Sequence, residues 1–125
     1  MTKQTIKRVN KIWGYEECII NTPQYCGKIL TLIPGFISSY HHHKKKDETF
    51  YVLEGKIYLR LGKRKRIMSS RDTQRVLPGQ KHEFASLDGI SKMVEFSTNH
   101  RDDDSYRDTN SRAIDISKLK QKFRI

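Results

Sequence analysis

The sequence has few cysteines and no long apolar run, and each shortage excludes a class of protein. Only Cys18 and Cys26 occur among 125 residues, and their spacing is neither C-x-x-C nor that of a zinc finger, so we expect reduced, partly buried thiols. The apolar stretches at 29–33 and 51–53 are far shorter than the roughly 18 residues that span a bilayer. No apolar stretch follows the basic residues near the N-terminus, so we expect a cytoplasmic protein without a secretory signal or membrane segment.

Acidic residues are scarce relative to basic ones. The chain has 25 Lys and Arg against 14 Asp and Glu, a net charge of +11, which favours anionic partners such as a phosphorylated small molecule. The basic clusters at 3–11, 44–46, 63–66 and 118–124 are spread along the chain, without an aromatic-interleaved RNA-binding motif or a helix-turn-helix pattern. We therefore interpret them mainly as a solvated basic surface and rank nucleic acid below small anionic ligands.

Short apolar segments separated by turn residues indicate a single all-β domain. A length of 125 residues fits one domain, and no repeat or linker divides it. Strands are expected at 28–33, 39–43, 49–53, 56–61, 73–77, 82–86 and 91–97, a pattern typical of a β-sandwich or barrel. Only 114–125 has a helical pattern, in which Ile114, Leu119 and Phe123 could share a face. A short helix and a disordered basic tail fit this segment equally well.

The expected core consists of the inward apolar residues of these strands. They are Ile29 or Leu30, Leu32, Phe50, Val52, Ile57, Leu59, Val76, Phe84, Val94 and Phe96. Their burial tests which face of each strand turns inward.

Three histidines and a glutamate form the pattern that carries chemistry. Alternate side chains of a strand share a face, so His41 and His43 project together while His42 points away. Glu48 begins the next expected strand after a turn, and His82 follows a Pro-Gly turn, so both can reach the same point. Three neutral imidazoles and a carboxylate suit a divalent Zn, Mn, Fe, Ni or Co ion with open positions for substrate. The sequence therefore predicts one metal ion bound by these four side chains.

The spacing of these residues resembles the first motif of the cupin family. That motif is matched position for position by Gly35, His41, His43, Glu48 and Gly55. The second motif is present in part, at Gly79 and His82, and its other usual residues are replaced by Arg71, Leu77 and Ser86. The resemblance implies an all-β double-stranded β-helix, or jelly-roll barrel, as a single domain over 1–125. Its barrel core would cover about 13–107 and a C-terminal extension 108–125.

Further segments resemble the small cupins that are similar to the mannose-6-phosphate isomerase domain of type II enzymes. They are 13–16, 25–30, 46–55, 95–98 and 102–107. The resemblance implies aldose–ketose interconversion of a sugar phosphate, a divalent metal cofactor and a homodimer, in which 6–20 could pair with a second copy. It also implies that Lys28 and Arg107 hold the phosphate, that Lys28 assists catalysis and that Tyr106 contacts substrate. The alternatives are a surface position for Lys28 and pairing of Arg107 with Asp103 or Asp104.

Isomerisation also requires a base that is not a metal ligand. Glu95 is our candidate, because Met93, Glu95 and Ser97 share one face of an expected strand, and a carboxylate inside a barrel needs a partner or a function. The alternative is an outward, solvated Glu95. Two other functions stay open, because one fold hosts many activities. They are a non-catalytic metal- and sugar-binding module and, less favoured, an Fe(II) dioxygenase.

Overall fold

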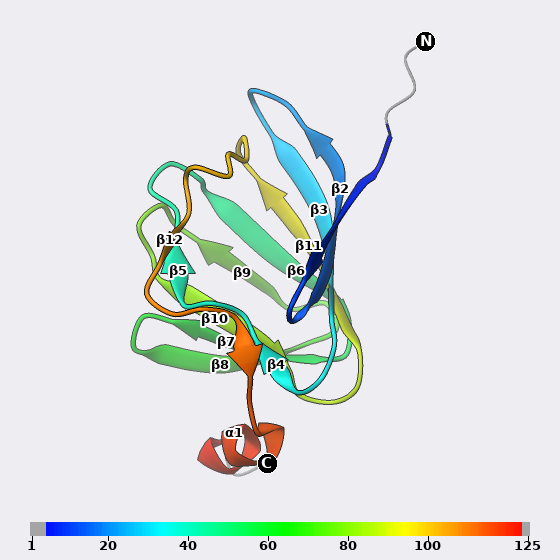
Figure 1. Cartoon of the computed structure of the whole chain (residues 1–125), viewed down its shortest axis with the longest axis vertical. Helices are drawn as coiled ribbons and strands as arrows, with labels where there is room; N and C mark the ends of the chain where they lie inside the picture. The colour runs from blue at the N-terminus through cyan, green and yellow to red at the C-terminus, as the bar shows by residue number, and fades with distance from the viewer. Residues whose placement is uncertain (1–4, 124–125) are drawn as a thin grey trace.

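The computed structural model describes residues 5–123 as two facing antiparallel β-sheets with one short C-terminal helix (Figure 1). The first sheet consists, in spatial order, of β1 (Lys7–Lys11), β2 (Gly14–Asn21), β3 (Cys26–Leu32), β11 (Ser91–Ser97), β6 (Glu48–Glu54) and β9 (Thr73–Val76). The second consists of β12 (Tyr106–Arg107), β5 (His41–His42), β10 (His82–Ser86), β4 (Phe36–Ile37) and β13 (Arg112–Ala113). The hairpin of β7 (Lys56–Leu61) and β8 (Arg64–Ser69) joins the second sheet through β10. This architecture confirms the predicted all-β fold class.

Most of the predicted strands are present with nearly the expected bounds. The bounds of β7, β10 and β11 are those predicted, whereas β3, β6 and β9 differ by one or two residues at their ends. The strand expected at 39–43 is reduced to β5 at His41–His42. The β1–β2 hairpin and β8 were not predicted. In β8 the sequence begins Arg-Lys-Arg, which looks like a solvated charged run, yet all six residues pair with β7.

The segment expected to pair with a second copy is largely paired within the chain. β1 pairs with β2, and β2 pairs with β3, both antiparallel. Within the described part of this segment, only the outer edge of β1 remains without a strand partner. Such an edge can accept another strand, so dimerisation through β1 stays a prediction.

The residues buried between the two sheets show that the predicted inward face of β11 was wrong. Val94 and Phe96 were expected inside, but Val94 is half-buried and Phe96 is 58% exposed. The inward side chains of β11 are instead Ser91, Met93 and Glu95, because the strand alternates and the buried Glu95 pairs with Lys46 in the interior. The buried core contains Trp13, Leu30, Leu32, Phe50, Val52, Ile57, Leu59, Met68, Val76, Phe84 and Met93.

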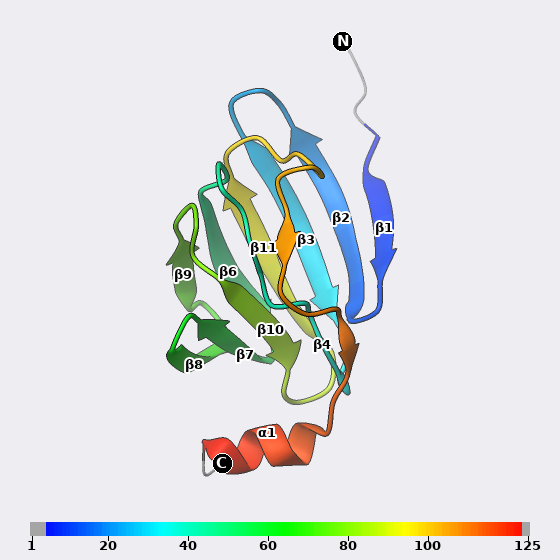
Figure 2. The same cartoon turned by 60° about the vertical axis from the view of Figure 1, so that its left-hand side comes forward.

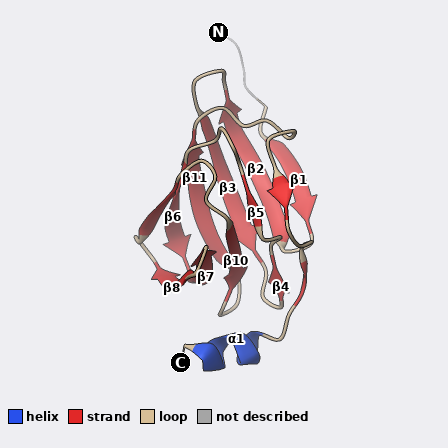
Figure 3. Cartoon of the chain, turned by 90° about the vertical axis from the view of Figure 1, so that its left-hand side faces the viewer, coloured by secondary structure: helices blue, strands red, loops and turns tan. Residues whose placement is uncertain are grey.

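The C-terminal segment forms a helix, so the disordered tail is excluded for its described part. α1 (Ile116–Lys122) is capped by Asp115, whose side chain accepts a hydrogen bond from the Ser117 backbone N–H. Leu119 packs against Ile37, Tyr58, Ala85 and Leu87, and Ile114 and Phe123 join the same cluster. The helix thus lies beneath the ends of β4 and β10 (Figure 2 and Figure 3). Residues 124–125 of the predicted segment lie outside the described residues.

Two sequence expectations concern cysteines and membranes. Cys18 and Cys26 are both free thiols, as expected, and burial raises the pKa of Cys26. Over residues 5–123 the search for a helix with the length and hydropathy of a membrane span finds none.

Candidate metal centre

Three histidine side chains meet in the cavity between the sheets. His41 lies on β5, His82 begins β10, and the two residues are direct partners in the β5–β10 pair. His43 follows β5 directly and its ring faces the other two. One nitrogen of each ring lies within 4.8 Å of the others. The three rings thus group their nitrogens as a candidate site for one metal ion, to which imidazole nitrogens would bind at about 2.0–2.1 Å.

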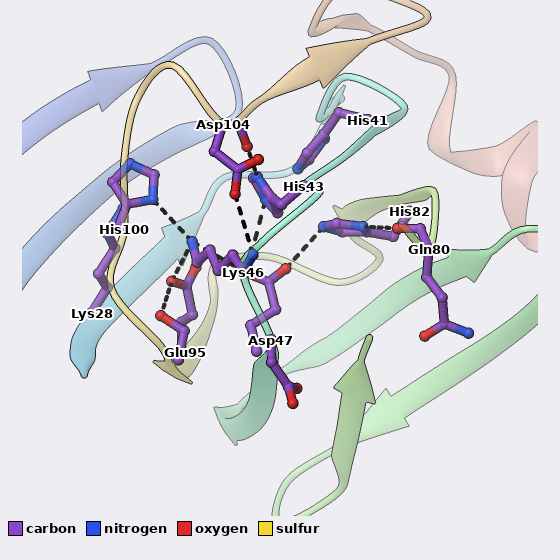
Figure 4. Close-up of polar contacts among 12 residues, drawn as sticks. Lys28, His41, His43, Lys46, Asp47, Gln80, His82, Glu95, His100 and Asp104 are labelled. Atoms are coloured by element: carbon purple, nitrogen blue, oxygen red, sulfur yellow. Dashed lines mark hydrogen bonds and ion pairs between the residues drawn. The ribbon is translucent and has the colours of Figure 1, made fainter. Parts of the chain in front are cut away.

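Backbone carbonyls fix which nitrogen of each ring is free. The Nδ1 atom of His41 lies 2.8 Å from the Ser39 carbonyl oxygen, that of His43 2.7 Å from the Asp104 oxygen, and that of His82 2.9 Å from the Gln80 oxygen. A carbonyl only accepts hydrogen bonds, so each Nδ1 must carry the proton and donate it. Each Nε2 therefore keeps its lone pair, as a metal ligand requires. Figure 4 shows the rings of His41, His43 and His82 converging.

Burial favours the neutral form of the His41 and His43 rings. For His41, desolvation and the neighbouring His82 lower the pKa to about 3. For His43, burial also lowers the pKa, although Glu48 acts in the opposite direction. Because only a neutral imidazole offers a lone pair, His41 in particular is ready to bind a metal at neutral pH without releasing a proton.

Glu48 supplies a fourth candidate ligand, a buried carboxylate. Its side chain is only 1% exposed; Oε1 lies 3.0 Å from His82 Nε2 and Oε2 lies 3.9 Å from His43 Nε2. Neither carboxylate oxygen nor His82 Nε2 forms a hydrogen bond with the described residues. Burial opposes the charge on Glu48, but His82 and Lys46 hold the pKa of the carboxyl well below its usual range. Glu48 Oε1 and His82 Nε2 face each other at 3.0 Å inside the buried site, and a carboxylate oxygen beside imidazole nitrogens suits a divalent metal.

Lys46 connects the histidine centre to a second carboxylate. Its ammonium Nζ is buried and lies 3.2 Å from Glu48 Oε2, 2.7 Å from Glu95 Oε2 and 3.1 Å from His100 Nδ1 (Figure 4). Burial disfavours its charge, but Glu95 and Glu48 together raise the pKa of Lys46 above its usual range. The ammonium thus neutralises two buried carboxylates and orients both.

Of the other predicted site residues, Glu95, Lys28 and Arg107 line the cavity of the histidines, and Tyr106 is not among its described lining residues. Glu95 is 4% exposed and Lys28, its partner across the β3–β11 pair, is equally buried, so the outward alternatives are excluded for both. Arg107 lies on β12 opposite His41 and lines the same cavity of about 680 Å³ as the histidines, Glu95 and Lys28. Tyr106 is outside the described lining of that cavity and stacks on His42. His42, the middle histidine of the run, therefore faces away, as alternation requires.

The acidic run before Arg107 does not pair with it. Asp103 forms a bidentate ion pair with Arg101. Asp104 accepts hydrogen bonds from the backbone N–H groups of Lys44, Lys45 and Lys46. Of the ion pairs among residues 5–123, none involves Arg107, which leaves its guanidinium free to face the cavity.

Sequence reasoning missed Lys46, His100 and Asp104. Lys46 precedes Glu48 by two residues, so strand alternation could have placed both side chains on one face. The sequence offered no comparable signal for His100 and Asp104, because their partners lie 54 to 61 residues away in the chain. Both residues lie in the loop after β11, which folds back over the histidine centre (Figure 4). Only this fold of the loop brings His100 to Lys46 and Asp104 to His43.

Replacing Asp104 with asparagine is expected to weaken the fold by about 1–3 kcal/mol at neutral pH, because Asn keeps only one of the two accepting oxygens. Although burial raises the pKa of Asp104, the backbone N–H groups of Lys44 to Lys46 lower it overall below the ordinary 3.8. Stability from a lowered pKa is present above 3.8 and is lost as the pH falls through the folded-state pKa. The wild-type advantage over Asp104→Asn, measured by urea unfolding, should therefore shrink below pH 3.8.

The exposed neighbour provides the control for this prediction. Asp103→Asn removes one carboxylate with the same formal change in charge, but its ion pair with Arg101 is on the surface and contributes little. An Asp104→Asn variant that unfolds like Asp103→Asn at every pH would show that Asp104 does not stabilise the 44–46 turn.

Comparisons with known proteins agree with this geometry. The sequence matches the cupin-domain family over residues 28–94, and no curated protein matches it. KdgF from Halomonas sp. is similar in structure, with a TM-score of 0.72 and 19% identity over 82% of this chain and 98% of KdgF. A Streptomyces PAC13 variant with uridine has a TM-score of 0.75 and 18% identity, over 94% of this chain and 98% of PAC13.

A longer protein also contains a similar unit. CapF, a capsular polysaccharide assembling protein from Staphylococcus aureus, has a TM-score of 0.74 and 19% identity over 84% of this chain. The match covers 34% of CapF, so this chain spans about a third of that protein. At such identities the structural neighbours share the fold alone. The cupin-domain match, by contrast, covers more than half of the 125 residues and includes the three histidines and Glu48, so the chain belongs to the cupin family.

Proposed function

We propose that the protein is a metal-dependent enzyme that interconverts an aldose and its ketose isomer in a phosphorylated or otherwise anionic sugar. The observation that carries this proposal is the second buried carboxylate, Glu95, which faces the cavity of the histidine centre. A site that only holds a metal needs no further acid inside it. The sequence resemblance to the mannose-6-phosphate isomerase domain of type II enzymes supports the same reaction.

Glu95 is the proposed base. Lys46 Nζ and the Ser97 hydroxyl both contact Oε2 of Glu95, whereas Oε1 has no hydrogen bond among residues 5–123. The ion pair with Lys46 requires the ionised carboxylate, which is the form that accepts a proton. Oε1 would take the proton from the carbon beside the sugar carbonyl and return it to the former carbonyl carbon, while the hydroxyl proton of the first carbon passes to the former carbonyl oxygen. A divalent cation bound by the three histidines and Glu48 would hold the two sugar oxygens and stabilise the negative charge that develops on them.

Cations around the cavity fit the anionic group of the substrate. Lys28 and Arg107 line the cavity together with Lys7 and Lys11 of β1. Glu16 lies 3.6 Å from Lys28 Nζ and 4.0 Å from Lys11 Nζ, so it partly balances those two charges, while Arg107 is free to donate to a phosphate. Two structural neighbours add support, because a polysaccharide assembling protein and a complex with uridine both involve sugar-containing molecules.

The test is a panel of aldose phosphates in ²H₂O, with protein loaded separately with Zn, Mn, Fe, Ni or Co. NMR should show the ketose product with deuterium at the former carbonyl carbon of the aldose, which receives the proton, and deuterium at the adjacent carbon of the aldose that is re-formed by the reverse reaction. Glu95→Gln should lower kcat by at least about 100-fold, the usual contribution of a general base, without loss of bound metal. The exposed Glu54 provides the control, Glu54→Gln, which should keep full activity.

The outcomes separate the alternative functions. Full metal loading with neither ketose formation nor deuterium exchange across the panel would contradict the isomerase and favour a non-catalytic binding module. Oxygen consumption with Fe(II) but not with Zn would instead favour dioxygenase chemistry.

A further inference from the structure

A second cavity lies away from the metal centre, between β8, β9 and the turn at 77–80. Its volume is about 890 Å³, and none of its described lining residues also lines the metal cavity. We call it the β8–β9 groove and define it by Leu59, Leu61, Lys63 to Arg66, Gln74, Arg75, Leu77 and Gln80. β8 and β9 lie beside each other at one side of the molecule (Figure 2). Nothing in the proposed isomerase uses these residues.

The charge of the groove is of one sign. Half of its described lining residues are Lys or Arg, and none is Asp or Glu, whereas the metal cavity contains four acidic side chains. Arg75 is neutralised by Asp47 at 2.6 Å, and Arg66 lies 3.9 Å from Asp72. Over residues 5–123, no ion pair involves Lys63, Arg64 or Lys65. An unpaired basic cluster at a cavity favours an anionic ligand.

Leucines give the groove an apolar part. Leu59 is buried, Leu61 is half-buried and Leu77 is 44% exposed. A phosphate backbone would leave these side chains without a partner. No aromatic side chain is among the described lining residues, so the groove lacks the stacking surface typical of single-stranded nucleic acid sites. The ligand should therefore combine negative charge with apolar groups.

One strand edge beside the groove is open. β8 pairs only with β7 among the described strands. The edge of β9 is different, because the carbonyl oxygens of Thr73 and Arg75 accept hydrogen bonds from the side chains of Arg66 and Gln74. An open edge can add an extended peptide through main-chain hydrogen bonds. Every second side chain of such a peptide would then point toward the leucines.

We propose that the β8–β9 groove binds an extended acidic peptide segment of a partner protein. The peptide backbone pairs with the free edge of β8, its alternate apolar side chains contact Leu61 and Leu77, and its carboxylates pair with Lys63, Arg64 and Lys65. This combination uses the charge, the leucines and the open edge together. The peptide and the metal would occupy different cavities, which share no described lining residue.

The test is fluorescence anisotropy of the full chain with a short labelled peptide that alternates glutamate with leucine or valine, at physiological ionic strength. The double variant Arg64→Glu with Lys65→Glu should weaken binding by at least about tenfold. Leu77→Ser should weaken it roughly fivefold, because part of the apolar contact is lost. Lys56→Glu with Lys118→Glu changes the net charge equally at exposed sites outside the groove and should leave binding unchanged.

Other outcomes would overturn the proposal. They are no binding of the alternating peptide, equal binding of a polyglutamate peptide without apolar residues, and tighter binding of duplex DNA that the Arg64→Glu, Lys65→Glu variant also loses. Circular dichroism and thermal unfolding of each variant show whether it is folded, and retained metal binding gives an independent check, since the metal centre lies elsewhere.

Discussion

Replacing Lys46 with alanine is expected to destabilise the protein by about 3–5 kcal/mol, the usual cost of removing one partner from a buried ion pair. The Lys46 side chain is 3% exposed and its ammonium lies 2.7 Å from Glu95 and 3.2 Å from Glu48. Without it, two ionised carboxylates would face each other inside the barrel with no positive charge between them. The free energy of unfolding, measured by urea denaturation with a metal chelator present, gives the size of the effect.

Controls separate this electrostatic loss from lost packing. Lys46→Met keeps most of the side-chain volume and should still be strongly destabilised, whereas Lys45→Met, at the exposed neighbouring lysine, should change stability by less than about 0.5 kcal/mol. Adding Glu95→Gln to Lys46→Met removes one of the two carboxylates that Lys46 no longer neutralises. The double variant should therefore recover about 0.5–3 kcal/mol relative to the sum of the single variants. Additive effects would contradict a direct Lys46–Glu95 interaction.

The ligand histidines could be predicted from the sequence because local geometry determines them. Alternation places His41 and His43 on the face opposite His42, and the structure brings His41, His43 and His82 together. His82 lies 41 residues after His41, but it begins a strand whose bounds the sequence predicts, and the two residues are paired directly. Motif spacing was therefore sufficient to predict the histidine cluster.

The electrostatic surroundings of the site could not be predicted in the same way. Lys44, Lys45 and Lys46 are chemically identical in the sequence, yet only Lys46 is buried. The loop after β11 decides this, because Asp104 accepts from the backbone N–H groups of all three residues and His100 contacts Lys46 Nζ. These contacts join segments far apart in the chain, and single-sequence periodicity contains no information about them.

For the fold, too, the sequence predicts what local patterns determine, and it misses what depends on contacts between distant segments. β7, in which Ile57, Leu59 and Leu61 alternate, was predicted with its bounds. So was β10, which lies between turn residues. β11 was predicted as a strand, but Val94 and Phe96 were placed in the core. Packing reverses this, because Glu95 pairs with Lys46 in the interior and Phe96 faces outward. A functional charge network thus overrides the hydrophobic pattern at this strand.

His41→Ala is expected to lower metal affinity by more than about 100-fold, since even the loss of a partner that orients a ligand costs roughly 10–100-fold. The matched control is His42→Ala, at the adjacent residue. The ring of His42 stacks on Tyr106 on the opposite face, with ring centroids 5.2 Å apart. Both variants therefore replace one histidine of the same run by alanine, but only His41→Ala removes a nitrogen from the metal centre. Equilibrium dialysis with Zn²⁺ and Co²⁺, followed by elemental analysis, measures the affinity and stoichiometry for each variant.

Thermal unfolding gives a second measure that does not depend on enzyme activity. A metal held only by the folded state stabilises it by about 2.7 kcal/mol at a free concentration of 100 Kd, so wild type and His42→Ala should both gain stability when the metal is added. His41→Ala should gain almost none. An equal loss of metal in both variants would mean that the run of histidines binds metal as a flexible surface cluster, and it would remove the basis for a centre built from His41, His43, Glu48 and His82.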